Sequence, residues 1–75
     1  MTGYVLIQAA PGANKRVAEQ LRKLDEVTEA HMTFGPYDVV AVVQFRDLAD
    51  MGDIIDRKIQ PVPGIVDTLT CLATD

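Results

Sequence analysis

Hydrophobic residues follow two different periods along the chain, and the change from one to the other marks the first expected elements. The segment 4–10 is short, apolar and rich in residues that favour strands, and Pro11-Gly12 follows it as a turn signal. After that turn the period becomes helical, with Val17, Leu21 and Leu24 on one face and charged residues on the other. The pattern therefore predicts a strand followed by an amphipathic helix of about three turns.

Two strands joined by a tight turn are expected next. In the segment 27–34, Ala30, Met32 and Phe34 alternate with polar residues, as on the two faces of a strand. The sequence Gly35-Pro36-Tyr37-Asp38 is typical of a hairpin turn. Residues 39–45 follow it and are apolar on both faces, which is typical of a central strand covered from both sides.

A second helix and a last strand complete the pattern. Asp47 is a favourable N-cap for the helix. The residues spaced to form its buried face are Leu48, Met51, Ile55 and Ile59. Prolines and a glycine at 61–64 end this helix, and a final strand is expected over 65–73. One side of that strand carries Val66, Thr68, Thr70 and Leu72.

The order of these elements is βαββαβ, which predicts an α+β fold of ferredoxin-like type over residues 1–75 as a single domain. The strand order would be 4-1-3-2, with both helices on one face of the sheet. The third strand is apolar on the other face as well, so a second copy is expected to cover it across a twofold axis. Replacing Val40 or Val42 with aspartate should unfold or dissociate the protein, on the expectation that one faces the partner and the other the helices.

The size and the cysteine content of the chain also favour assembly with further copies. A chain of 75 residues is near the lower limit for a domain that is stable alone. The lone Cys71 cannot form an internal disulfide, and with the lone His31 it makes no zinc site. We therefore expect no metal and no cofactor, and oligomerisation remains as the source of stability. Cys71 itself is expected to be a small buried apolar side chain.

Charge and hydropathy exclude several partners. The net charge of −4 repels phosphate backbones, so direct DNA binding is not expected. The longest apolar run, residues 39–43, is too short to span a membrane. A free cysteine and the absence of a recognisable export signal favour the cytoplasm.

Three segments together carry a family resemblance. The turn Gly35-Pro36-Tyr37-Asp38 with the valines after it resembles the glycine-x-tyrosine-aspartate hairpin of the Lrp/AsnC ligand-binding domain, also called the RAM domain. The segment 63–70 resembles the last turn and strand of that domain, and the opening strand 4–7 and first helix also fit. Each motif is short, but their order and spacing cover the whole chain.

The resemblance implies a dimeric α/β barrel that assembles further into rings, such as octamers or decamers, with small amino-acid effectors bound between dimers. The family's helix-turn-helix half is not expected here, because the first strand begins within a few residues of Met1. The chain then resembles a stand-alone regulatory domain. Its expected role is in transcriptional regulation, as a sensor or as a modulator of full-length Lrp/AsnC regulators.

The candidate ligand-binding residues suit an amino acid chemically. Asp38 can accept hydrogen bonds from the ammonium group, while Thr68, Thr70 and backbone N–H groups near Gly35 can hold the carboxylate. Tyr37 can supply an apolar wall with a polar tip. The same glycine and aspartate also occur in hairpins for purely structural reasons, and threonines are ordinary strand formers.

Other functions share this strand order. A cofactor-free enzyme of dimeric α/β-barrel type, a monooxygenase or an isomerase, needs titratable groups inside a pocket. The expected interior is apolar and His31, the one candidate base, lacks an evident partner, so no catalytic residues are expected. An ACT-type amino-acid sensor would carry a glycine-rich turn after the first strand, where Pro11-Gly12 is a weak match. A ligand-free assembly adaptor remains as a further alternative.

Overall fold

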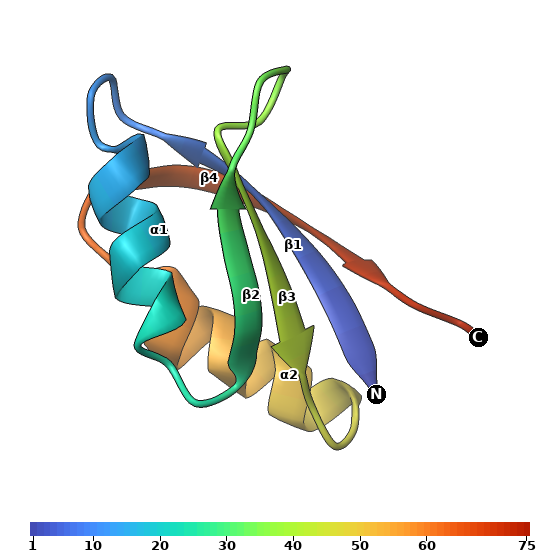
Figure 1. The fold of residues 1–75 in the computed structure, drawn as a ribbon. Coiled ribbons are helices and arrows are strands. Elements are labelled where there is room, and N and C mark those ends of the chain that lie inside the picture. Colours follow the sequence, from blue (N-terminus) through green and yellow to red (C-terminus); the bar gives the residue numbers. More distant parts are fainter.

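A four-stranded antiparallel sheet lies at the centre of the computed structural model, which describes all 75 residues (Figure 1). The elements are β1 (Thr2–Ala9), α1 (Asn14–Arg22), β2 (Val27–Met32), β3 (Val39–Gln44), α2 (Leu48–Ile54), the π-helical turn η1 (Ile55–Ile59) and β4 (Ile65–Leu72). The strand order is β2-β3-β1-β4. The expected ferredoxin-like α+β fold, with β1 and β3 in the middle of the sheet, is thus confirmed.

The hydrophobic core lies between the helices and one face of the sheet. Figure 1 shows both helices on that side of the sheet. The helices contribute Val17 and Leu21 from α1, and Met51 and Ile54 from α2. The strands contribute alternate residues, of which the fully buried ones are Val5, Ile7, Val39, Ala41 and Val43. Both helices therefore cover the same face, as the right-handed crossovers predict.

The second helix departs from the predicted periodicity. Leu48, expected to be buried, is 67% exposed, while Ile54 is buried although the helical spacing did not select it. The helix changes to π geometry after Ile54, and a π-helix holds more residues in each turn than an α-helix. Ile54 and Ile59, five residues apart, consequently both reach the core.

A bulge changes the pattern of β2. The pairing register with β3 shifts between Val27 and Glu29, so Val27 and Ala30 are both buried although strict alternation would separate them. The strand ends at Met32, and Phe34, expected at its end, lies fully exposed in the turn. The predicted strand was therefore two residues too long.

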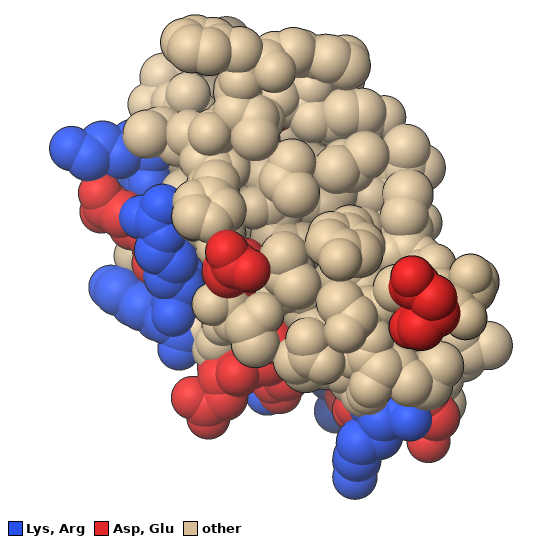
Figure 2. Space-filling model, turned by 45° about the vertical axis from the view of Figure 1, so that its right-hand side comes forward, with Lys and Arg blue, Asp and Glu red and all other residues tan.

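The other face of the sheet carries no helix, and we call it the open face. The cross-strand register places its apolar side chains together: Tyr4, Leu6, Val40, Val42 and Leu69. Figure 2, in which the right-hand side of Figure 1 is turned forward, shows a broad surface with few charges and most charged side chains along the left and lower margins. The sheet therefore presents an uncovered apolar surface, as expected.

Two expectations about individual residues of this face are wrong. Val40 and Val42 both lie on the open face, since they pair with Leu6 and Tyr4, and neither faces the helices. Cys71 is exposed rather than buried, because it pairs with Tyr4 and so also lies on the open face.

An ion pair joins η1 to the segment before β2. The Lys58 ammonium donates to Glu26 Oε2, and the second oxygen of this partly buried carboxylate has no partner. The hydrogen bond from Lys58 holds the pKa of Glu26 below its ordinary value. Because the folded-state pKa is depressed, the pair stabilises the fold above the unfolded pKa of about 4.3, and this contribution is lost as the pH falls through the lower folded value.

We accordingly expect the urea midpoint of unfolding to fall as the solution is acidified below about pH 4.3. Glu26→Gln should be less stable than wild type near neutral pH, and its midpoint should depend less steeply on pH in this range. Chemical unfolding followed by circular dichroism at several pH values measures both. Identical pH dependence in the two proteins would contradict this role for Glu26.

Candidate functional site

The turn between β2 and β3 brings three of the predicted site residues together. Gly35 has a φ of +135°, a conformation that favours glycine, and no atom crowds it. The Thr33 hydroxyl donates to the carbonyl of Tyr37 at 2.8 Å, and Gln8 Nε2 on β1 donates to the Pro36 carbonyl at 3.4 Å. The turn is thus held both by its own hydrogen bonds and by β1.

Asp38 ties this turn to the end of β1. Its Oδ2 accepts the backbone N–H of Ala9 at 2.8 Å, and its own N–H donates to the carbonyl of Ile7 at 2.8 Å. The second carboxylate oxygen makes no hydrogen bond within the chain and can accept one from a ligand. Asp38 therefore has a structural function, so Asp38→Ala would leave the Ala9 N–H unpaired, whereas Asp38→Asn keeps an acceptor there.

Thr68 and Thr70 lie on β4, an edge strand. They pair with Ile7 and Val5 of β1, so both side chains lie on the same face of the sheet, the one covered by the helices. Both residues are only partly buried. The expectation that the two hydroxyl-bearing side chains share a face agrees with this register.

The two groups of residues do not meet within one chain. β1 lies between β3 and β4, so Asp38 and Thr68 flank the same residue, Ile7, from opposite sides. Two strand spacings put their backbones about 10 Å apart. No cavity of the chain is lined by both the turn and Thr68. A single site that uses both the turn with Asp38 and the strand with Thr68 therefore needs a further structural element to connect them.

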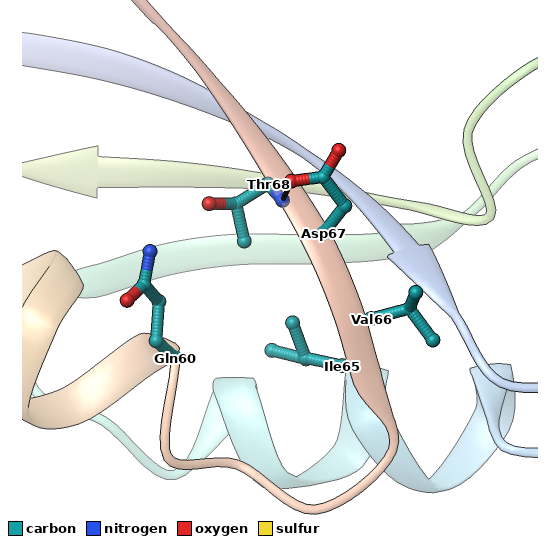
Figure 3. A pocket seen from close by; sticks show the side chains of 5 residues that line it. All are labelled: Gln60, Ile65, Val66, Asp67 and Thr68. Carbon is teal, nitrogen blue, oxygen red and sulfur yellow. Dashed lines mark hydrogen bonds between the residues drawn. The ribbon is translucent and has the colours of Figure 1, made fainter.

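A cavity of about 290 Å³ lies against the first half of β4 (Figure 3). Its lining residues are Gln60, Ile65, Val66, Asp67 and Thr68. Asp67 Oδ1 accepts the backbone N–H of Thr68 at 2.9 Å, which leaves the second carboxylate oxygen without a partner in the chain. Of these residues only Thr68 was predicted from the sequence as a site residue.

His31 has a partner that could not be predicted from the sequence pattern. Its Nε2 lies 3.2 Å from Glu29 Oε1, and the two side chains are 64% and 62% exposed. Both residues lie on the open face, beside Val40 and Val42. The pair lines none of the three cavities, so it lacks the enclosed position that a catalytic base needs.

Comparison with known proteins identifies the family. The Lrp/AsnC ligand binding domain matches residues 2–75. The chain belongs to this family. An HTH-type transcriptional regulator of Pyrococcus furiosus is 31% identical to it over 96% of the chain and 50% of the regulator. The chain thus spans about half the length of the curated relatives it matches, and the predicted resemblance is confirmed.

Solved structures of other proteins share this fold. The hypothetical protein PHS023 from Pyrococcus horikoshii is 35% identical, with a TM-score of 0.90, over 96% of this chain and 87% of that protein. Escherichia coli AsnC is 27% identical, with a TM-score of 0.92, over 99% of this chain and 50% of AsnC. A Neisseria meningitidis regulator solved with L-Met shares the fold at 16% identity, with a TM-score of 0.89 over 99% of this chain and 49% of the regulator. None of the helices of the present chain has the length and hydrophobicity to cross a membrane.

Proposed function

We propose that this domain binds a small amino acid and assembles with copies of itself, and that it acts in cytoplasmic transcriptional regulation as a sensor or as a modulator of full-length Lrp/AsnC regulators. The family match over residues 2–75 is the observation that carries this proposal. The relatives are named as transcriptional regulators, which favours a regulatory role over a catalytic one. The proposal includes no cofactor and no DNA contact by these 75 residues.

The polar groups at the turn suit one end of an amino acid. Asp38 has a carboxylate oxygen available for the ammonium group, and the partly buried Tyr37 lies next to it in the chain. Backbone N–H groups near Gly35 suit the carboxylate. The Neisseria regulator, which shares this fold, was solved with L-Met, and this supports an amino acid as the ligand; at 16% identity it says nothing about individual residues.

Assembly would complete the site. Asp38 and Thr68 lie on opposite sides of β1 and share no cavity, so a second chain is the simplest element to join the turn of one subunit with β4 of another. The open face supplies an apolar surface for the first such contact. Tyr4 and Leu69 on this face are 44% and 49% exposed, and a second sheet packed against them would remove this apolar area from water.

Calorimetric titration of the twenty amino acids tests the ligand proposal. At least one should bind in the micromolar to millimolar range, roughly −4 to −8 kcal/mol, because the ligand is small and both of its charged ends must be desolvated. Asp38→Asn should weaken that binding by about 30-fold, or about 2 kcal/mol, since it removes the charge but keeps an acceptor for the Ala9 N–H.

Glu19→Gln is the matched control, because it makes the same change of charge at an exposed position on α1. It should bind as wild type does. If no amino acid binds at millimolar concentration, the sensor proposal is wrong and the domain is an assembly adaptor. If Asp38→Asn binds as tightly as wild type, the ligand does not use this carboxylate.

A further inference from the structure

The cavity beside β4 is lined by negative charge only. Asp67 is the only charged residue that lines it, and no lysine, arginine or histidine does. The other polar side chains are the amide of Gln60 and the hydroxyl of Thr68, while Ile65 and Val66 complete the lining. A negative group placed here would meet the Asp67 carboxylate without any cation to offset the repulsion.

The hydrogen bonds around Asp67 leave mainly acceptors for a ligand. Figure 3 shows the Gln60 and Thr68 side chains on one side of β4 and the Asp67 side chain on the other, with one Asp67 carboxylate oxygen turned back to the Thr68 N–H. Because that N–H is taken and points away from β1, the Thr68 carbonyl also points outward from the edge of the sheet. The free carboxylate oxygen, this carbonyl, the hydroxyl and the Gln60 amide oxygen can all accept hydrogen bonds.

We propose that this cavity binds a cationic N–H donor, a primary ammonium or a guanidinium group, and that the effector is therefore a basic amino acid such as lysine, ornithine or arginine. The proposal rests on the amino-acid function proposed above. It assigns Asp67 and Gln60 to the recognition of the ligand's side chain, while Asp38 receives the α-ammonium group. It also moves the ligand's carboxylate away from Thr68, where the sequence analysis placed it, because Asp67 would repel it.

A comparison of lysine with norleucine distinguishes a cationic subsite from amino-acid binding in general. Norleucine has the same carbon chain as lysine without the ε-ammonium group. Calorimetry on the full chain should show that L-lysine binds wild type at least 10-fold more tightly than L-norleucine. In Asp67→Asn this preference should fall below 2-fold. The asparagine Oδ1 can still accept the Thr68 N–H, so the local structure of β4 is kept.

Glu19→Gln, with the same change of net charge, should retain the full preference for lysine. If norleucine binds wild type as tightly as lysine, or if the preference survives in Asp67→Asn, the cationic subsite is wrong and the amino-acid function stands. If none of the twenty amino acids binds wild type, the proposed function fails and this subsite fails with it.

Discussion

Val42→Asp should convert the assembled protein into monomers. Val42 lies on central strand β3, on the open face, between Tyr4 of β1 and Glu29 of β2. An aspartate there would place a charge in the middle of the proposed contact between copies and beside an existing carboxylate. Sedimentation velocity at low micromolar concentration should give a multiple of the chain mass for wild type and the single chain mass for the variant.

Leu48→Asp provides the matched control for this experiment. Leu48 is an exposed apolar residue at the start of α2, away from the open face, so this variant should assemble as wild type does. Val42 is outside the helix-side core, so the variant should keep its far-ultraviolet circular dichroism spectrum. A wild-type protein that sediments as a folded monomer would contradict both the interface and the shared ligand site.

Gly64→Ala should destabilise the fold by about 2 to 6 kcal/mol, the sum of backbone strain and overpacking at this position. Gly64 has a φ of +97°, which residues with a Cβ rarely adopt. A Cβ there would lie 2.9 Å from the Ala13 Cβ and 3.2 Å from Val17 Cγ2. Both neighbours are buried where α1 meets the sheet, so neither can move away easily.

Gly12→Ala separates the two causes. Gly12 also has a positive φ, +80°, but its Cβ would meet nothing within 4 Å. We expect this variant to be less stable than wild type by only the cost of the backbone strain, about 1–2 kcal/mol. Urea unfolding of both variants measures the difference. Equal losses of stability in the two variants would show that crowding of the added Cβ against α1 contributes nothing at position 64.

The fold could be predicted from the sequence because the spacing of its apolar residues clearly distinguishes strands from helices. Alternate apolar residues in the strands and the helical spacing of Val17 and Leu21 define elements that admit few arrangements. The errors lie where the period itself changes. The π turn after Ile54 and the bulge at the start of β2 both depend on tertiary packing, which a strict period of 3.6 or 2 does not include.

The candidate site could be predicted only in part. The turn and the strand were both visible as motifs, but their separation by β1 follows from strand order and assembly. Gln60 belongs to the turn after η1, and no local pattern places it beside β4. Asp67 does carry a signal, because it is the only charged residue of β4 and precedes Thr68, but the family resemblance includes it only as part of a motif.

Native mass spectrometry before and after addition of an amino-acid pool tests the central claim most directly. We expect an assembly of several chains and, with the pool, a mass increase equal to one amino acid for each occupied site. The Lys–norleucine comparison then identifies the charge of the bound side chain. A chain that remains monomeric and gains no mass at millimolar amino acid would contradict the account.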